Sequence, residues 1–527
     1  MPSPEYWLCI LYFGLLSLLA IYGIHRGFIA YIYLFGKRPQ KARTSLQNYP
    51  KVTVQLPIYN EKNVVSRLID AVCKLTWPRH ALEIQVLDDS TDETTTLIDN
   101  CVSYWQQKGL NITTIRRTTR QGYKAGALAY GMRTASGEYI AIFDADFIPP
   151  QDFLQRCIAP FQSPRVGMVQ ARWEHHNRQQ NLLTQTSSIL LDGHFVLEHT
   201  ARYYSGRFFN FNGTAGIWRK QCIMEAGGWQ HDTITEDLDL SYRAQLCGWQ
   251  FVFFPDYTVP AEVPAHMSAF KSQQYRWAKG TFQTAKKLLP VIAKTHFPSK
   301  IKLEALIHLT SNVGYPATLC IALLMPFCAF IRHQHELSWA LHLDIIAFCC
   351  TTGSIGAFYT LSQQQAHPQR WLASAWKIPL AMMLAVGLAV NQTKAAYAGL
   401  YSHDTTFVRT PKSGEDSSTA YHLPWEWSCL FEIGLGLYCL SSAYWLFTYT
   451  IWQSIPFLLL FGWGFLYVGF CSFLDGLQMC TTKPTTSPSH ADPETFAAVR
   501  DASHIHSSKP VLQHPQNQVP KPEVPSA

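Results

Sequence analysis

The chain has 527 residues, of which 47% are hydrophobic and only 15% are charged. This length allows one large domain together with a membrane region, and the composition favours an integral membrane protein. The net charge of +7 requires no nucleic-acid partner, because much of it lies at membrane edges, and fourteen cysteines without a CxxC pair argue against a zinc site or a disulfide framework.

The first element is an uncharged apolar run from Trp7 to Ile24, close to the ~20 residues that a membrane-spanning helix needs. Four basic residues follow it: Lys37, Arg38, Lys41 and Arg43. Basic residues after a span are typical of its cytosolic end. We therefore predict an N-terminal transmembrane segment over residues 1–36 and a cytosolic domain after it.

Residues 45–290 alternate short β-rich runs with helical periodicity, which is typical of βαβ units and a mostly parallel, doubly wound sheet. A helix with one apolar face is expected between the first two strands, over Val64 to Val72. Ligands of such sheets bind beyond the carboxyl ends of the strands. The predicted strands are Val52 to Leu56, Ile84 to Leu87, Ile112 to Ile115, Tyr139 to Phe143 and Val166 to Gln170.

Carboxylates follow two of these strands directly. Asp88 and Asp89 come after the second strand, and Asp144 and Asp146 come after the fourth. A nucleotide sugar carries a diphosphate, which is usually neutralised by a divalent cation held by one or two carboxylates. We predict that Asp146, with Asp144, binds a divalent cation and that all four line a nucleotide-sugar site. The alternative is that aspartate follows strands because it forms turns.

Two further segments fit the same site. Tyr59 and Glu61, after the first strand, suit a base and a ribose. Lys124 lies where a helix is expected to begin, and the helix dipole and the ammonium group both favour a diphosphate there. An exposed lysine in a first helical turn is an equally good interpretation of Lys124 alone.

Later in the domain, Thr235-Glu236-Asp237 precedes another helix. Inverting glycosyl transfer needs one carboxylate to accept the proton of the attacking hydroxyl, and Asp237 is the candidate base. Ordinary helix capping is the alternative.

The run Gln273-x-x-Arg276-Trp277 lies before the next apolar segment. Trp277 can stack on an acceptor sugar while Gln273 and Arg276 hold the diphosphate or the glycan; a plain interfacial anchor is the alternative.

Residues 291–478 form the predicted C-terminal membrane region. Its apolar run over 378–390 is short for a span, so we predict an interfacial or re-entrant helix. Counting crossings then makes the 401–424 loop cytosolic. The tail, 481–527, is rich in Pro, Ser, Thr and His and is expected to be disordered. The four predicted spans are Thr310 to Ile331, Ile345 to Leu361, Ile433 to Trp452 and Ile455 to Phe473.

In this order, the motifs Asp88-Asp89, Asp144-Ala145-Asp146, Thr235-Glu236-Asp237 and Gln273-x-x-Arg276-Trp277 resemble those of the processive family 2 glycosyltransferases. The likeness is strongest to plant cellulose-synthase-like mannan and glucomannan synthases and their bacterial relatives, over about residues 50 to 290. It rests also on the runs Gln85 to Asp92, Gly122 to Leu128, Val169 to Trp173 and Phe211 to Gly216.

This resemblance implies an α/β GT-A catalytic domain joined to a helical transmembrane bundle. It implies that Asp89 helps to hold the nucleotide, that Asp146 binds Mg²⁺ or Mn²⁺ and that Asp237 is the base. Asn212, Gly213 and Thr214, with Glu236 and Trp277, would line the acceptor site, where cellulose synthases carry a Cys-Gly-Ser-like run. It also implies a loop that closes over the nucleotide, represented here by Phe407, Arg409, Thr410 and Lys412.

The expected function is transfer of a hexose from UDP-glucose or GDP-mannose to a growing β-linked polysaccharide, at a plasma, inner or Golgi membrane. The expected partners are the donor, a polysaccharide or glycolipid acceptor and membrane lipid, without nucleic acid. A non-processive enzyme that makes a glycolipid stays open. A transporter whose soluble domain senses nucleotide sugars is a further alternative. It predicts inverted repeats and charges inside the spans, and neither is evident beyond Asp344 and Glu432, which lie at the edges of the apolar segments.

The predicted topology has a direct test. A cysteine introduced at Ser413 should resist a membrane-impermeant thiol reagent applied from outside, because two crossings separate the 401–424 loop from the first cytosolic segment. Efficient labelling would mean that residues 378–400 cross the membrane. A cysteine introduced between the last two predicted spans is the control that should react.

Overall fold

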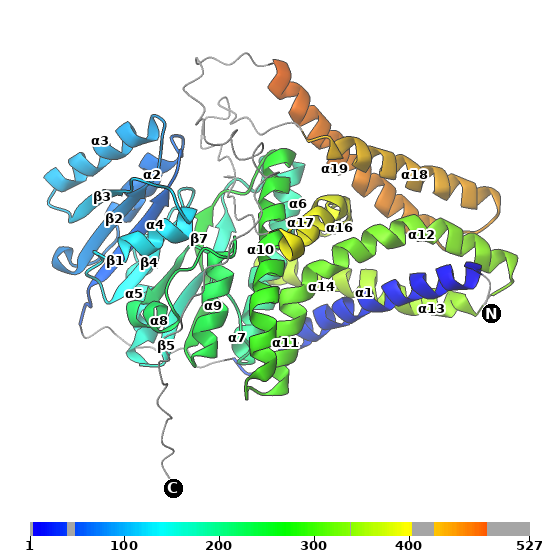
Figure 1. Cartoon of the computed structure of the whole chain (residues 1–527), viewed down its shortest axis with the longest axis horizontal. Helices are drawn as coiled ribbons and strands as arrows, with labels where there is room; N and C mark the ends of the chain where they lie inside the picture. The colour runs from blue at the N-terminus through cyan, green and yellow to red at the C-terminus, as the bar shows by residue number, and fades with distance from the viewer. Residues whose placement is uncertain (1–3, 39–47, 338, 403–425, 482–527) are drawn as a thin grey trace, which may run out of the picture. The chain divides into compact units, whose positions relative to one another are not determined.

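The computed structural model describes residues 4–38, 48–337, 339–402 and 426–481. It contains a seven-stranded sheet with helices on both faces and a set of long apolar helices (Figure 1). The predicted closing-loop residues Phe407, Arg409, Thr410 and Lys412, and the tail from residue 482, lie outside the described residues.

The sheet has the strand order β3-β2-β1-β4-β6-β5-β7. Its first four strands are parallel, β6 is antiparallel to β4 and to β5, and β5 is parallel to β7. The five predicted strands are confirmed, whereas β6 and β7 were not predicted. The strands are β1 Val52–Ile58, β2 Leu82–Asp88, β3 Ile112–Arg116, β4 Tyr139–Ile142, β5 Val166–His175, β6 Gly216–Arg219 and β7 Gln250–Ala261.

The sheet is mostly parallel, as the sequence predicted, and β6 is the antiparallel strand among the strands that the structure describes. The segment before β6 crosses the edge where β4 ends, since Thr214 accepts a hydrogen bond from the backbone N–H of Asp144. A strand that enters at that edge has to run back against β4. This crossing places residues 212–214 beside the predicted Asp144-Ala145-Asp146 motif.

Alternating side chains of each strand build two cores, as the two-residue period of a strand requires. Val54 and Phe143 belong to the core under α2 Val65–Cys73, α3 Thr94–Gln107 and α5 Phe153–Ile158. Ile142 and Trp218 belong to the core under α4 Tyr123–Gly131, α8 Lys220–Glu225 and α9 Glu236–Leu246. Helices thus cover both faces and leave the carboxyl edge of the sheet for ligands.

Two longer helical segments complete the sheet domain. One consists of α6 Leu182–Asp192, a π-helical turn η3 Gly193–His199, and α7 Thr200–Tyr204. The other is α10 Met267–Lys294, which carries Gln273, Arg276 and Trp277. Short elements elsewhere are η1 Arg79–Ala81, η2 Ala159–Gln162, η4 Ser311–Val313 and α15 Trp371–Ala375.

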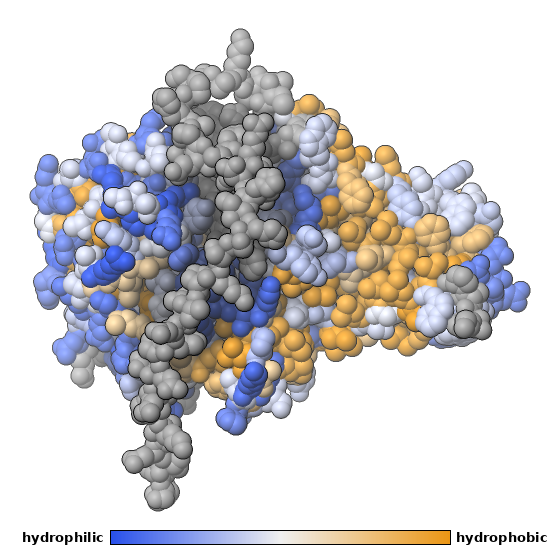
Figure 2. Space-filling view, in the orientation of Figure 1, coloured by the Kyte–Doolittle hydropathy of each residue, from blue (hydrophilic) through white to orange (hydrophobic). Residues whose placement is uncertain are grey.

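Five described helical stretches are long and apolar enough to cross a membrane, at the positions of the five predicted spans: Glu5–Phe35, Ser299–Gln334, His342–Ala366, Ser428–Thr448 and Ile455–Leu477. Figure 2 shows apolar residues covering the surface over this region. The helices are α1 Pro4–Phe35, α11 Ser299–Thr310, α12 Gly314–Gln334, α13 Ala340–Phe348, η5 Cys349–Gly353, α14 Ser354–Ala366, α18 Ser428–Thr448 and α19 Ile455–Thr481.

The short apolar run forms two helices, α16 Ile378–Gly387 and α17 Ala389–Tyr401. The stretches Trp371–Gly387 and Ala389–Tyr401 meet at a 44° bend, which fits a broken span as well as a re-entrant segment. A Cβ at Gly387 would lie 2.3 Å from the carbonyl oxygen of Gly464 on α19. Such close backbone approach through small residues is typical of helix packing in membranes.

A buried ion pair joins α10 to the membrane helices. The ammonium group of Lys271 donates to both carboxylate oxygens of Glu432 on α18, at 2.8 and 3.0 Å. The two side chains are 2% and 0% exposed. The side-chain amide of Asn391 on α17 donates to the backbone carbonyl of Lys271 at 3.0 Å. Three helices are therefore fixed at this point.

We expect Lys271→Met to lower stability strongly, by about 3–5 kcal/mol, because it leaves a buried carboxylate without its cation. The double variant Lys271→Met/Glu432→Leu should recover most of this loss, since neither charge is then buried. Thermal unfolding of the purified protein in detergent, followed by circular dichroism, measures both. A double variant less stable than the single one would contradict this interpretation.

Candidate active site

A pocket of about 190 Å³ lies at the carboxyl edge of the sheet. Its walls come from the segments after β1, β2, β4 and β7, the starts of α4 and α9, and the middle of α10. Thirteen residues predicted from the sequence line it: Tyr59, Glu61, Asp89, Lys124, Asp144, Asp146, Asn212, Gly213, Glu236, Asp237, Gln273, Arg276 and Trp277.

The two aspartates at the end of β2 take different positions. Asp89 lines the pocket, and its carboxylate accepts hydrogen bonds from Nε of Arg117, at 3.0 Å, and from Nη2 of the same guanidinium. Asp88 is 2% exposed and does not line the pocket. It binds Nε of Arg116 at 2.8 Å and the backbone N–H of Ser90 at 2.9 Å. Asp88 therefore shapes the loop that carries Asp89.

An aromatic and cationic stack forms the wall near β1. The guanidinium carbon of Arg120 lies 3.3 Å from the ring centroid of Tyr59 and 4.9 Å from that of Tyr123. Burial lowers the pKa of Arg120, and the nearby phenol groups and Asp89 oppose that shift. The sequence prediction missed Arg120. The cluster of arginines after β3 was the available signal.

Lys124 connects the two acidic segments of the pocket. Its Nζ donates to Oδ1 of Asp144 at 2.5 Å and to the carbonyl of Gly213 at 2.9 Å. Burial disfavours its charge, but Asp144 and Glu236 outweigh burial and raise its pKa above the ordinary lysine value. Thr214, predicted at the acceptor site, does not line the pocket; it is fully buried under Asp144 and fixes that turn.

Asp237 lies in the first turn of α9, partly buried, and its Oδ1 accepts the backbone N–H of Leu238 at 2.8 Å. Burial and, to a lesser extent, the adjacent Glu236 raise its pKa to about 7, while Lys124 opposes the shift. The pKa of Glu236 is also raised by burial. A carboxyl group with a pKa near neutrality suits proton transfer at physiological pH.

The middle of α10 forms another part of the pocket wall. Gln273, Arg276 and Trp277 all line it. Burial lowers the pKa of Arg276 to about 10, against the opposing effect of Glu236, Asp144 and Asp237, so it stays cationic. Gly280 allows α10 to lie close to the start of α9. A Cβ at this position would come within 2.4 Å of the side chain of Thr235.

Three further pocket residues were not predicted: Trp173, His175 and Glu262. Burial lowers the pKa of His175 to about 4, so its imidazole is neutral. Glu262 binds Nη2 of Arg67 at 2.6 Å, and its backbone N–H donates to Oδ2 of Asp146 at 3.4 Å. They lie at the ends of β5 and β7, and β7 was not predicted, so nothing in the sequence directed attention to Glu262.

The acidic pair after β4 fits a divalent cation. Within the described part of the chain, no group of three His, Cys, Asp or Glu side chains could hold a metal ion alone. A magnesium-type site needs only one or two carboxylates when substrate phosphates supply the other ligands. Asp144 and Asp146 both line the pocket and provide such hard oxygen donors.

Comparison with known proteins shows the family to which this chain belongs. Residues 53–223 match Glycosyl transferase family 2, and residues 139–390 match Glycosyl transferase family group 2. Glucomannan 4-beta-mannosyltransferase 7 of Arabidopsis thaliana is 32% identical over 488 residues, which are 85% of this chain and 84% of that protein. The chain belongs to glycosyl transferase family 2.

The resemblance to plant mannan and glucomannan synthases is thereby confirmed, and the sheet domain has the GT-A fold of this family. The probable glucomannan 4-beta-mannosyltransferase 10 of Arabidopsis thaliana is 41% identical over 305 residues, so the chain spans about half, 55%, of that relative. A solved mannosyltransferase from Pyrobaculum calidifontis, in complex with GDP-Man and Mn2+, is 22% identical with a TM-score of 0.48, over 70% of this chain and 98% of that one.

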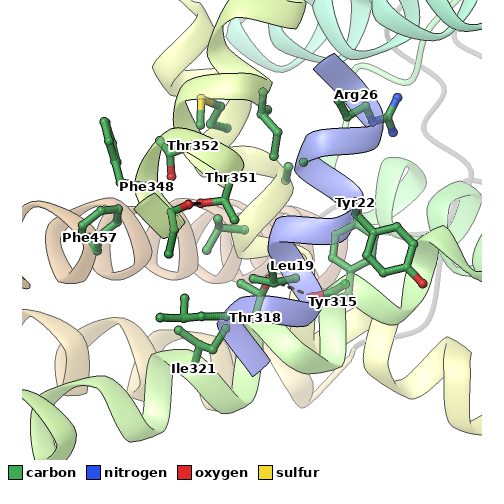
Figure 3. Close-up of a pocket in the computed structure, with 18 of the residues that line it drawn as sticks. Leu19, Tyr22, Arg26, Tyr315, Thr318, Ile321, Phe348, Thr351, Thr352 and Phe457 are labelled. Carbon is green, nitrogen blue, oxygen red and sulfur yellow. Dashed lines mark hydrogen bonds between the residues drawn. The ribbon is translucent and has the colours of Figure 1, made fainter. Parts of the chain in front are cut away.

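A second cavity, of about 330 Å³, lies among the apolar helices of this chain. Figure 3 shows residues of its lining: Leu19, Tyr22 and Arg26 of α1, Tyr315 of α12, Thr351 of η5 and Phe457 of α19. Glu198 and Arg202 of the sheet domain also line it. One end of this cavity therefore meets the domain that contains the catalytic pocket.

Gly213 provides a test of the pocket geometry. Its φ is +83°, and a Cβ there would lie 3.1 Å from Oδ2 of Asp237 and 3.3 Å from Nζ of Lys124. Gly213→Ala should displace both groups and reduce sugar transfer at least about tenfold, as small misplacements in active sites do.

The matched control is Gly206→Ala. Gly206 also has a positive φ, +64°, but nothing lies within 4 Å of a Cβ there. Both variants should therefore lose about 1 kcal/mol from backbone strain, while only Gly213→Ala loses activity. Equal activity losses in the two variants would exclude crowding of Asp237 and Lys124 as the cause.

Proposed function

We propose that this chain is a membrane-embedded, inverting glycosyltransferase that adds mannose or glucose, from GDP-mannose or UDP-glucose, to a growing β-linked polysaccharide. Residues 45–290 form its catalytic domain on the cytosolic side, and residues 1–36 and 291–478 form its membrane region. The proposal rests above all on Asp237, whose carboxyl group has a pKa of about 7 in a pocket that also holds Lys124, Arg276 and Trp277.

In this proposal Asp237 is the general base. It accepts the proton of the acceptor hydroxyl as that oxygen attacks the anomeric carbon from the face opposite the leaving diphosphate. With a pKa of about 7, about half of the carboxyl group is still deprotonated at neutral pH, and the raised pKa makes the carboxylate a stronger base. Trp277 supplies a stacking face for the terminal sugar of the acceptor, next to Glu236 and Asn212.

The leaving diphosphate requires positive charge, and Lys124 of α4 and Arg276 of α10 supply it. Asp89, held by Arg117, and the stack of Tyr59 with Arg120 suit the ribose and the base. Asp146, with Asp144, would hold Mg²⁺ or Mn²⁺, which supplies Lewis-acid neutralisation of the diphosphate when bound.

The names of the relatives favour a mannosyl donor and a β-1,4-linked glucomannan product, so GDP-mannose is the first donor to test. Membranes containing the chain should incorporate labelled mannose into a polymer that an endo-β-mannanase digests, and UDP-glucose should be tried alongside. Label that extracts into chloroform and methanol as a single-sugar lipid would support the glycolipid alternative. No transfer from either donor would refute the proposal.

The carboxylates should separate by role. Asp146→Asn should weaken binding of nucleoside diphosphate with Mg²⁺ or Mn²⁺ as well as turnover, because it removes a metal ligand. Asp237→Asn should leave that binding near the wild-type value while transfer falls about 10²- to 10⁴-fold, as loss of a general base does. Isothermal titration beside a sugar-incorporation assay measures both.

The pH profile is the control for Asp237. The deprotonated carboxylate is the active form, so kcat/KM should rise with pH through about 7 and fall below it. This acidic limb should disappear in Asp237→Asn and persist in Asp146→Asn. Substantial polymer synthesis by Asp237→Asn would mean that Asp237 only stabilises the start of α9.

A further inference from the structure

The cavity among the apolar helices runs along one face of α1. Its lining on this helix extends from Tyr12 to Arg26, and Leu19 and Tyr22 lie between them (Figure 3). An α-helix rises ~1.5 Å per residue, so the cavity extends over about 21 Å. The apolar part of one bilayer leaflet is only ~15 Å deep, half of the hydrocarbon core. The cavity is therefore long enough for the acyl chain of a lipid.

Several hydroxyl groups that line the cavity are already used within the protein. Those of Tyr22, Thr318 and Thr351 each donate to a backbone carbonyl, at 2.6 to 3.0 Å. Leu19 and Ile321 add hydrocarbon between them (Figure 3). Such a wall gives the many hydroxyl groups of a sugar chain few partners, whereas an acyl chain has no polar group to satisfy.

The cavity is distinct from the catalytic pocket. Among the residues that the structure describes, none lines both. The helix α10, whose Gln273, Arg276 and Trp277 line the catalytic pocket, contributes no described residue to the cavity. The cavity therefore does not continue the catalytic pocket, and its own lining has to indicate what fills it.

Three arginines share two carboxylates where the cavity meets the sheet domain. Arg26 pairs with Glu198. Nη1 of Arg202 lies 3.5 Å from Oε2 of Glu198, and its Nε lies 3.0 Å from Oε1 of Glu304. Nε of Arg207 lies 3.4 Å from the other oxygen of Glu304. One positive charge is thus in excess in a largely apolar surrounding, which favours binding of an anion.

Arg26 is the arginine of this cluster that an anion can reach. Its side chain is 33% exposed, against 3% for Arg202 and 11% for Arg207. A guanidinium group has five N–H donors and binds phosphate through two of them, so one carboxylate does not saturate it. Arg26 also lies two residues after the apolar run over 7–24, at the predicted cytosolic end of the first span. The cytosolic leaflet is the one that carries anionic lipids.

We propose that this cavity binds an anionic phospholipid of the cytosolic leaflet, with the phosphate group on Arg26 and one acyl chain along α1 and α12. The proposal goes beyond sugar transfer and rests on the membrane embedding proposed above. Glu198 and Arg202 belong to the sheet domain, whereas Arg26 belongs to α1. The lipid therefore contacts both parts of the chain.

Native mass spectrometry of the full chain in detergent measures the site, with phosphatidylglycerol and phosphatidylcholine of identical acyl chains as probes. The wild type should bind one phosphatidylglycerol at least about tenfold more tightly than phosphatidylcholine, because only the former carries a net negative charge. Arg26→Gln should abolish most of this preference, since the charged pair with phosphate is lost. The matched control is Lys37→Gln, which removes an exposed cation on the same predicted side of the membrane and should leave the preference unchanged.

Ala347→Phe tests the part of the site that holds the acyl chain. Ala347 lines the cavity, so a phenyl ring there should weaken binding of both lipids about tenfold by displacing part of the chain. Ile346→Phe on the same helix is the control and should bind both lipids as the wild type does. Ile346 is 59% exposed and does not line the cavity.

A phosphatidylglycerol with a photoreactive acyl chain should label α1 or α12 of the wild type. Labelling confined to other helices, equal binding of both lipids by the wild type, or a Lys37→Gln variant as weak as Arg26→Gln would overturn the proposal. Displacement of the lipid by a β-manno-oligosaccharide would also overturn it, because the cavity would then belong to the glycan. A chain that stays in solution without detergent would refute the membrane embedding and this proposal with it. Sugar transfer does not enter these measurements, so a failure of the transfer reaction is distinguishable from a failure of this proposal.

Discussion

The ammonium group of Lys124 is the interaction on which the rest of the catalytic pocket depends. Four carboxyl groups, those of Asp144, Asp146, Glu236 and Asp237, line one pocket and repel one another. Lys124 binds Asp144 directly. Its charge also stabilises the deprotonated forms of Glu236 and Asp237 without a hydrogen bond to either. Lys124 also binds the backbone carbonyl of Gly213, and so links Asp144 to the segment over residues 212–214.

That balance explains why the pKa of Asp237 is raised and not depressed. Burial and Glu236 favour its protonated form more than Lys124 favours its charged form. In the proposed function, a bound diphosphate would add negative charge near Lys124, so the cationic groups would become more important when the donor is present. Arg276 reaches the pocket from α10. It stays cationic although it is buried, because the charges of Glu236, Asp144 and Asp237 stabilise its guanidinium group.

The sequence predicted the strand ends well because the physical signal there is local. An apolar run followed at once by carboxylates marks both the strand and its open end, as with Asp89 and Asp146. The sequence could not separate Asp88 from Asp89, because their different positions depend on Arg116 and Arg117 reaching across from β3.

The antiparallel strand β6 and the neighbours of Asn212 depend on contacts between segments far apart in sequence, which no local pattern encodes. The prediction that Thr214 meets the acceptor was wrong because the position of Thr214 under Asp144 also depends on such a contact.

The buried pair of Lys271 and Glu432 has a consequence for descent. The two residues are 161 positions apart, yet neither charge is tolerable without the other in so dry a place. A lineage that loses one of them is under immediate pressure to lose or replace its partner. Lys271 lies two residues before Gln273 on a helix that lines the pocket. The apolar helix α18 and the pocket-lining face of α10 are therefore expected to have been inherited as a matched set, and not exchanged separately between relatives.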